Sequence, residues 1–401
     1  MKARFNMKQT TFGILLGALL AGIGQAASVH LTIWSYLTPP EVNVVQEYAN
    51  RWAQAHGATV SVELQPGSNF NEFLTAAPTG KGPDIIFGLP HNNVGPFYAA
   101  GLVEPLPAGF IDPSDYSKDA LNACSFNGTL YSVPLAEETY ALFYNKKLVP
   151  TPPKTWDQLV AIAKALDQKY GAYHGFMYDI TNFYYTYAII HGMGGYVFKI
   201  GPHGYEANQI GLGNAGAIRA YTFIQDLVTK DHLMPSDVNY NIAMARFDAG
   251  QLGMTITGPW GISSVQQAHI DFGIAPLPSP SAPFSGYQVA FVSRFSHNQQ
   301  MAFSLLHYLV VHTPLALLKA GHRIPAEIGF QKTLQVTQNP LVEPFVKQFA
   351  TAQAMPNIPA MNAVWTPEGN ILSELIQGKV TPEQAAQIVV KQIEVGIATQ
   401  H

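Results

Sequence analysis

The sequence predicts an α/β protein with two domains or one large domain, and three observations support this class. The chain has 401 residues, while a domain commonly holds about 100–200. Apolar residues make up 47% of it, which excludes disordered and collagen-like classes. From residue 30 onward, segments with the apolar spacing of strands alternate with segments that have the spacing of helices. This alternation is typical of a parallel-type sheet covered by helices.

The first 26 residues are expected to be a secretory signal peptide rather than part of the fold. Three basic side chains precede an apolar run at 12–23, and Gly24-Gln25-Ala26 offers small residues for cleavage after Ala26. The alternative is a retained membrane anchor, but the run is shorter than the ~20 apolar residues that span a bilayer. No cysteine follows the run, which excludes lipid attachment there. A soluble, periplasmic protein is expected.

In the first part of the chain, three strand-like segments alternate with two helix-like ones. Strands are expected at 30–34 and 59–64, and over 82–87, where a Gly-Pro turn leads into a buried run. Helices are expected at 40–56 and 70–77, because apolar side chains recur there with helical spacing.

Further along the chain, strand-like and helix-like segments continue to follow one another, but the segments that connect them are less regular. Thr155 is expected to cap a helix after the proline-rich stretch 150–156. Residues 276–287, which are rich in Pro and Ser, are the best candidate for a crossing between two lobes. The remaining expected elements are strands at 130–135, 142–144 and 253–257, a helix at 217–228, and a C-terminal helix that begins near 381–383.

Charged residues make up only 12% of the chain, against roughly 25% in a typical soluble domain. The formal charge is −4, and without the three basic residues of 1–26 it is −7, from 19 basic and 26 acidic side chains. No block of like charge is present, so nucleic acid and acidic membranes are not supported as partners. Few carboxylates suit adaptation to acid, because protonation then removes few native charge interactions; drift toward uncharged polar surfaces is the alternative.

Motifs of enzymes and metal sites are missing. There is no Gly-rich phosphate loop, no G-x-S-x-G segment and no H-E-x-x-H segment. The 13 histidines lack metal-ligand spacing, and Cys124, the single cysteine, excludes an internal disulfide and a cysteine metal site. Neither a metal nor a cofactor is implied.

One carboxylate pair, Glu137-Glu138, lies where a strand meets a loop. On a strand these side chains point to opposite faces, so they cannot cooperate as an acid/base pair. A glycoside hydrolase needs two carboxyls that face one substrate, and a distant partner for Glu138 remains open.

Aromatic residues gather at the ends of expected elements. Trp260 follows Gly258-Pro259, Trp365 follows the loop 355–359, and the run 183–187 follows a turn. Aromatic faces match the apolar C–H faces of sugar rings, and phenol hydroxyls reach sugar hydroxyls. Each ring could instead fill the core, but their place at loop ends favours a binding site.

Several segments together carry a resemblance to a known family. They occur in the family's order across nearly all of the chain after residue 26, at 31–34, 82–87, 128–134, 144–146, 152–156, 194–196, 258–260 and 355–359. The sequence resembles the extracellular solute-binding proteins of sugar ABC importers. Pro-Pro-Lys-Thr-Trp at 152–156 and Met-Pro-Asn-Ile-Pro at 355–359 are specific to the maltose/maltodextrin-binding branch.

The resemblance implies the type II periplasmic binding protein fold, with two α/β lobes and a cleft between them. Each lobe is expected to hold a mostly parallel sheet flanked by helices. The implied limits are 27–136 and 290–334 for the N-terminal lobe, 140–284 and 341–401 for the C-terminal lobe, and hinge segments near 137–140, 285–289 and 335–340.

The resemblance also implies the ligand-binding residues. In the second lobe these are the stacking Trp260 and Trp365, the aromatic Tyr184, Tyr185 and Tyr187, the hydroxyl-binding Glu138 near the hinge, and Met355 in the wall. The first lobe departs from the family pattern, because its charged pairs are replaced by uncharged residues. Thr38, His91 and Asn92 are the expected ligand residues there.

The implied function is a monomeric, non-enzymatic subunit that binds maltose or a maltodextrin and delivers it to the transmembrane subunits of an ABC permease. Three alternatives stay open. They are a binding protein for another neutral disaccharide such as trehalose, a secreted glycoside hydrolase that uses Glu138, and a chemoreceptor adaptor that only signals.

Overall fold

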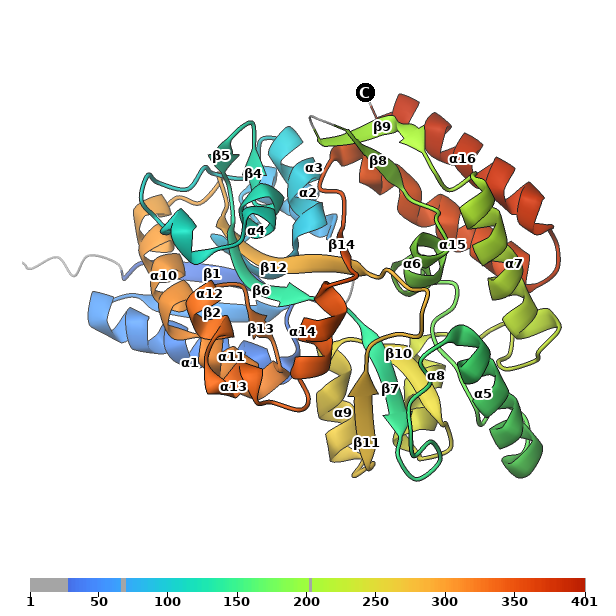
Figure 1. The fold of residues 1–401 in the computed structure, drawn as a ribbon. Coiled ribbons are helices and arrows are strands. Elements are labelled where there is room, and N and C mark those ends of the chain that lie inside the picture. The colour runs from blue at the N-terminus through green and yellow to red at the C-terminus, as the bar shows by residue number, and fades with distance from the viewer. Residues whose placement is uncertain (1–27, 66–69, 202–203, 401) are drawn as a thin grey trace, which may run out of the picture.

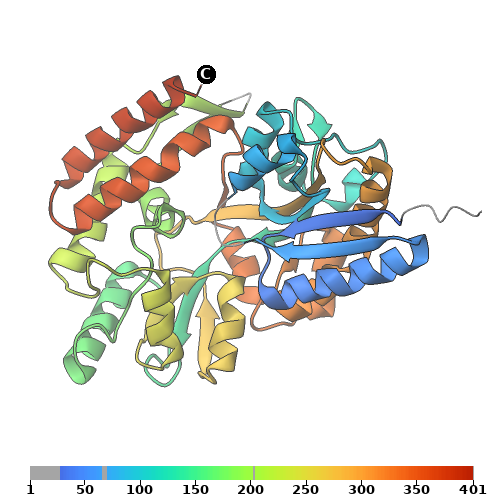
Figure 2. The same cartoon turned by 180° about the vertical axis from the view of Figure 1, so that it is seen from behind.

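The computed structural model describes residues 28–65, 70–201 and 204–400. The expected signal peptide at 1–26 lies outside these residues. The chain forms two α/β lobes with separate sheets and cores. Figure 1 shows one lobe on the left in blue, cyan and orange, and the other on the right in green, yellow and red; Figure 2 shows the same division from behind. The expected two-lobed α/β architecture is confirmed.

The first lobe is built on a sheet with the strand order β13-β6-β12-β3-β1-β2, and β14 pairs with β12. The strands β1, β2 and β3 are parallel, as their alternation with helices predicts, but β12 is antiparallel to both β3 and β6. The sheet is therefore mixed rather than mostly parallel, because β12 returns from the second lobe in the opposite direction. Its strands are β1 (His30–Ser35), β2 (Thr59–Leu64), β3 (Ile85–Pro90), β6 (Val133–Glu138), β12 (Phe284–Val292), β13 (Ile324–Pro325) and β14 (Gln353–Ala354).

The second lobe has a sheet with the order β10-β7-β11, in which β7 (Ala141–Asn145) is antiparallel to β10 (Met254–Thr257) and to β11 (Phe272–Ala275). The expectation of a mostly parallel sheet is wrong here. The strand β7 enters from the first lobe, while β10 and β11 both run against it on either side. Two hairpins complete the strands: β4 (Ser125–Phe126) with β5 (Thr129–Leu130), and β8 (Phe198–Gly201) with β9 (Gly204–Ile210).

Helices cover both faces of the first sheet. On one face, α1 packs against α10 and α11, and Val45, Trp52 and Leu306 meet sheet residues such as Ile33. Phe73, Phe97 and Phe291 fill the other face. The helices of this part are α1 (Pro39–His56), α2 (Glu72–Ala76), η1 (Ala77–Thr79), η2 (His91–Asn93), α3 (Val94–Ala99), η3 (Pro113–Asp115), α4 (Lys118–Ala123), α10 (Gln299–His312), α11 (Pro314–Gly321), α12 (Ile328–Gln331) and α13 (Leu334–Thr337).

The second lobe carries the remaining helices, and α7, α15 and α16 pack together at its outer side (Figure 1). The predicted cap of Thr155 is confirmed, since its hydroxyl oxygen accepts the Gln158 N–H over 3.3 Å. The helices are α5 (Trp156–Tyr170), α6 (Phe183–Gly192), α7 (Ala215–Thr229), α8 (Tyr240–Asp248), η4 (Pro259–Gly261), α9 (Ile262–Gln267), α14 (Glu343–Phe349), η5 (Pro359–Met361), α15 (Asn362–Ile376) and α16 (Pro382–Ala398).

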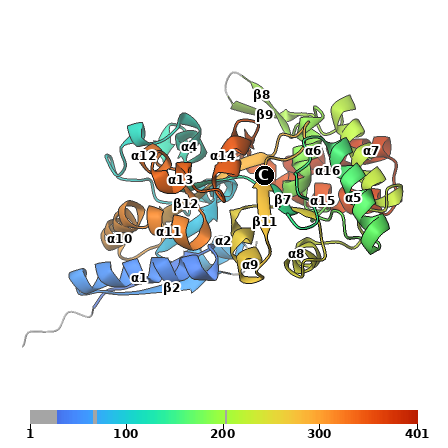
Figure 3. The same cartoon turned by 60° about the horizontal axis from the view of Figure 1, so that its bottom comes forward.

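The chain passes between the two sheets at several points. It leaves the first sheet at the end of β6 and enters the second at β7, and it returns between β11 and β12, within the predicted crossing at 276–287. Figure 3, seen from below, shows β7, β11 and β12 at this junction. The exact limits of the lobes stay a prediction. In the part of the chain that the structure describes, no single helix is long and apolar enough to cross a bilayer; only α10 and α11 together reach that composition, and they are bent by 64°.

Candidate functional site

An aromatic cluster forms where α6 meets the start of β12. Asn182 caps α6 and accepts the Tyr184 N–H over 3.1 Å, which places the aromatic run in the first two turns. Phe284, the first residue of β12, stacks on Tyr187 with ring centroids 3.7 Å apart and planes inclined by 8°. The ring centroid of Phe284 also lies 6.2 Å from that of Tyr184. Phe284 thus links Tyr187 to Tyr184, and nothing in its local sequence marked it.

The two tryptophans expected to stack on a ligand lie at the edge of this cluster. The ring centroid of Trp260, in η4, lies 6.3 Å from that of Tyr184. The ring centroid of Trp365, in the first turn of α15, lies 6.2 Å from that of Phe284. The indole of Trp260 folds back over Gly258, where a β-carbon would lie only 2.2 Å from the ring. A side chain at position 258 would therefore collide with this indole.

Exposure separates the five predicted aromatic residues into two groups. Tyr184, Trp260 and Trp365 are half-buried, so each residue keeps some exposed surface. Tyr185 and Tyr187 are buried at 5% and 1% exposure. The hydroxyl of Tyr187 donates to Gln353 over 2.9 Å. In this conformation Tyr184, Trp260 and Trp365 can meet a ligand, whereas Tyr185 packs beside Tyr184 and Trp260, and Tyr187 stacks on Phe284.

Glu138, at the end of β6, is buried and faces away from Glu137, as the strand period predicts. Its Oε2 accepts the amide of Gln288 over 2.6 Å, and its Oε1 contacts the guanidinium of Arg323. Glu137 instead accepts from Gln331 over 3.3 Å on the other side. The two carboxylates therefore do not face one substrate.

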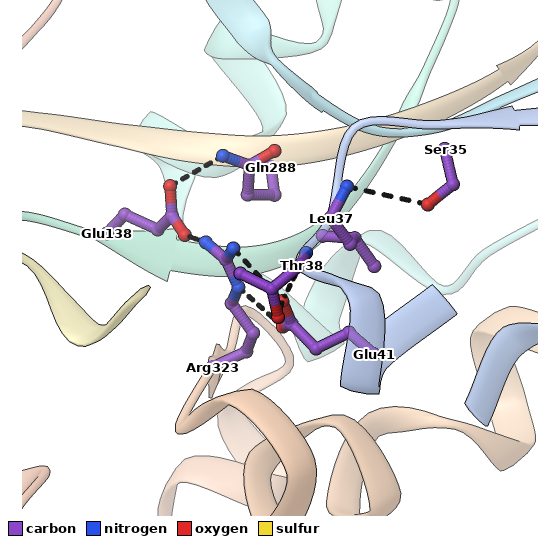
Figure 4. Close-up of polar contacts among 7 residues, drawn as sticks. All are labelled: Ser35, Leu37, Thr38, Glu41, Glu138, Gln288 and Arg323. Atoms are coloured by element: carbon purple, nitrogen blue, oxygen red, sulfur yellow. Dashed lines mark hydrogen bonds and ion pairs between the residues drawn. The ribbon is translucent and has the colours of Figure 1, made fainter. Parts of the chain in front are cut away.

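Arg323 and Glu41 join this group, and sequence reasoning missed both. The Nε of Arg323 donates to Glu41 Oε1 over 2.6 Å. The backbone N–H and the hydroxyl of Thr38 both donate to Glu41 Oε2, over 2.8 and 2.5 Å. Figure 4 shows the resulting chain of polar contacts from Thr38 to Gln288. Burial by itself would raise the pKa of Glu41, but the Arg323 charge and the hydrogen bonds from Arg323 and Thr38 hold it below its usual value.

The other predicted residues of the first lobe lie around η2. His91 is fully buried; its Nδ1 accepts the Tyr287 N–H over 3.2 Å, and its Nε2 lies 3.1 Å from the Met355 carbonyl. Because a carbonyl can only accept, Nε2 carries the hydrogen and the ring is neutral. Neither ring nitrogen is free for a ligand in this conformation. Asn92, the next residue, is also buried.

Met355 lies directly after β14, which pairs with β12. Its side chain is buried against Gly286, where an added β-carbon would be 2.9 Å from Met355 Cε. His91, Met355 and Gly286 therefore lie together at the junction between the lobes. Within 28–65, 70–201 and 204–400, no group of three or more His, Cys, Asp or Glu side chains is placed to hold a metal ion.

Comparisons with known proteins place the chain among sugar-binding relatives. A family model described as bacterial extracellular solute-binding protein matches residues 47–344. The chain is 28% identical over 367 residues to the maltotriose-binding protein of Pyrococcus abyssi, covering 88% of this chain and 79% of that protein. It is 27% identical over 369 residues to the galactooligosaccharide-binding protein of Bacillus subtilis, covering 88% and 86%.

A solved structure gives a stronger match over the whole fold. The maltose-maltodextrin binding protein of the thermoacidophilic bacterium Alicyclobacillus acidocaldarius is 42% identical, with a TM-score of 0.86. The match covers 91% of this chain and 100% of the Alicyclobacillus protein.

Proposed function

Because this chain belongs to the bacterial extracellular solute-binding proteins, we propose that it binds maltose or a maltodextrin between its lobes and delivers it to an ABC permease. The relatives support this ligand class, since they are named as binding proteins for maltotriose, maltose-maltodextrin or galactooligosaccharide. Ligand contacts to both lobes favour the closed state, because a ligand can shift a hinge equilibrium only by binding one state more tightly. The permease then recognises the closed form.

The half-buried rings of Trp260, Trp365 and Tyr184 carry this proposal. Such rings present flat apolar faces that fit the C–H faces of a glucose unit. They project from η4, α15 and α6, three elements of one lobe, and so offer more than one ring-sized surface. A ligand with several sugar units fits this arrangement better than a single monosaccharide does.

The protein is proposed to act in the periplasm as a soluble, unlipidated monomer after removal of 1–26. The apolar run at 12–23 and the absence of a following cysteine support this placement. Deletion of the gene for this protein should abolish the uptake of labelled maltotriose by the cells that normally produce it. A protein that only signals would leave that uptake unchanged.

The specific sugar is tested with a panel of maltose, maltotriose, trehalose and a galactooligosaccharide, titrated while tryptophan fluorescence is followed. Trehalose represents the alternative of another neutral disaccharide, and the galactooligosaccharide is included because a relative carries that name. Tightest binding of a maltodextrin is expected. A clear preference for either other sugar would replace the maltodextrin, while no response to any member would remove the proposed function.

Hydrolysis is not part of the proposal. The Glu138 carboxylate is paired with Arg323, and a paired carboxylate is held ionised, whereas a glycosidase acid must carry a proton. Incubation with maltotriose for hours should therefore release no new reducing ends. Steady release that is lost in Glu138→Gln would support the hydrolase instead.

A further inference from the structure

We propose that Arg323 is a positioning residue that orients Glu138 and Thr38 as hydrogen-bond acceptors for the hydroxyls of the bound sugar. The inference rests on the proposed function, because it assigns a role at the same site. Arg323 itself is buried and acts through its two carboxylate partners rather than by touching the ligand.

The guanidinium connects two carboxylates, those of Glu41 and Glu138, which are 97 positions apart in the chain. On one side its Nη1 contacts Oε1 of Glu138, and on the other its Nε and Nη2 donate to both oxygens of Glu41, over 2.6 and 3.2 Å. A planar guanidinium that binds both oxygens of a carboxylate fixes its own orientation as well as that of the partner. Glu138 is held from its other oxygen by Gln288.

The local backbone prepares this contact. Helix α11 ends at Gly321, and His322 takes a left-handed conformation with φ 57°, which turns the chain so that Arg323 precedes β13. The Glu41 carboxylate packs directly on Gly321, where a β-carbon would lie 2.2 Å from it. Gly321 and Arg323 therefore both lie against the Glu41 carboxylate.

The contacts among Arg323, Glu41, Thr38 and Glu138 determine whether the site offers hydrogen-bond donors or acceptors to a ligand. The hydroxyl hydrogen of Thr38 is already donated to Glu41, so the half-buried Thr38 oxygen can only accept further hydrogen bonds. The ionised Glu138 carboxylate is also an acceptor. Sugar hydroxyls are the matching donors, and the same arrangement disfavours a ligand that presents carboxylate or phosphate oxygens.

Removal of Arg323 would reverse this polarity in a pH-dependent way. Glu41 and Glu138 would then be buried without their cation, so one of them would take up a proton and become a donor. Three other charged or titratable groups lie nearby: His322, His91 and Glu137. His322 interacts electrostatically with Glu41, His91 lies beside Gly286, and Glu137 lies on the opposite face of β6. None of these supplies a fixed positive charge to replace the guanidinium.

The test compares Arg323→Met with Arg323→Lys, and uses Arg294→Met as the control, since Arg294 is exposed and lies 3.9 Å from Glu104 in a surface pair. The dissociation constant for maltotriose is measured by calorimetry at about pH 5.5 and about pH 7.5, because a buried carboxyl that has lost its cation is protonated more fully at the lower of these values. We expect Arg323→Met to weaken binding by about tenfold, as for an unsatisfied buried acceptor, and to weaken it further at the lower pH. Arg323→Lys should recover most of the affinity, and Arg294→Met should match the unmodified protein.

The inference is overturned if Arg323→Met binds like the unmodified protein at both pH values, or if its loss is the same at both and Arg323→Lys recovers nothing. If Arg323→Met does not fold, Glu41→Gln takes its place, because it keeps the side-chain shape. Glu41→Gln lets Thr38 accept from the new amide, so maltotriose binding should weaken about threefold or more, and unchanged binding would count against the inference. Failure of the unmodified protein to bind any sugar would instead remove the proposed function.

Discussion

Tyr221 donates its phenolic hydrogen to Oε1 of Glu368 over 2.8 Å, and both side chains are completely buried between α7 and α15. Burial raises the pKa of Glu368 to about 8, although the Tyr221 hydrogen bond lowers it in part. The carboxyl is therefore protonated at neutral pH inside the second lobe. The contribution of Glu368 to the stability of the folded protein therefore falls as the pH rises, not as it falls.

The first prediction concerns stability against pH. Because the folded pKa of Glu368 lies above its unfolded value of 4.5, its contribution is complete below pH 4.5 and is lost as the pH rises toward 8. The total change from this group is about 5 kcal/mol. Glu368→Gln should remove this dependence, as measured by the melting temperature at a series of pH values. The exposed Glu394→Gln serves as control. An unchanged pH profile in Glu368→Gln would contradict the assignment.

His91 is expected to act in the opposite direction. Burial lowers its pKa to about 4, although the Met355 hydrogen bond raises it in part, so the folded state binds fewer protons than the unfolded state between pH 4 and 6.5. Its contribution is present above pH 6.5 and is lost as the pH falls to 4, by about 3 kcal/mol. His91→Gln should lose less stability than the unmodified protein over this interval in chemical unfolding. Equal losses in both proteins would show that His91 is not the responsible group.

These two groups bear on the low charge content of the chain. On acidification the contribution of Glu368 to the free energy of unfolding rises, while that of His91 falls. The two changes therefore partly cancel between pH 6.5 and 4.5. A steep overall loss of stability between neutral pH and about pH 4 would count against adaptation to acid.

The stacking residues are tested by Trp260→Ala and Trp365→Ala. Each should weaken maltotriose binding by ~1–3 kcal/mol, on the scale of a buried aromatic side chain. Calorimetry is the suitable measurement, because the variants lose the fluorescent groups themselves. Phe295→Ala, which removes an exposed aromatic ring from the first lobe, should leave the affinity unchanged. Full affinity in both tryptophan variants would mean that the ligand binds elsewhere.

Gly258→Ala provides a subtler test of the same indole. The new methyl group would meet the Trp260 ring at 2.2 Å, so the indole must move while remaining present. Maltotriose binding should weaken by about 1 kcal/mol or more, with a changed tryptophan emission spectrum before sugar is added. Gly329→Ala is the matched control, since its methyl group would touch only the Glu327 carboxylate, at 3.3 Å. A Gly258→Ala protein with normal emission and affinity would contradict the role of this glycine.

Much of the fold was predictable because local side-chain spacing reflects local backbone geometry. The expected helix at 40–56 is α1, and the expected strand at 59–64 is β2. The expected helix at 70–77 is instead the short α2 followed by η1, because Pro78 lacks the N–H that would continue an α-helix. Strand direction was less predictable, because β12 pairs with partners that lie far away in the sequence.

By itself the sequence determined the α/β class, the positions of most elements and the tryptophans at loop ends, because these depend on residue type and on near neighbours. Only the tertiary structure decided that Arg323 joins Glu41 to Glu138, that Phe284 covers Tyr187, and that both ring nitrogens of His91 are engaged. The reason is physical: a buried polar or aromatic group must find its partners in three dimensions, and these partners come from segments up to 282 residues apart.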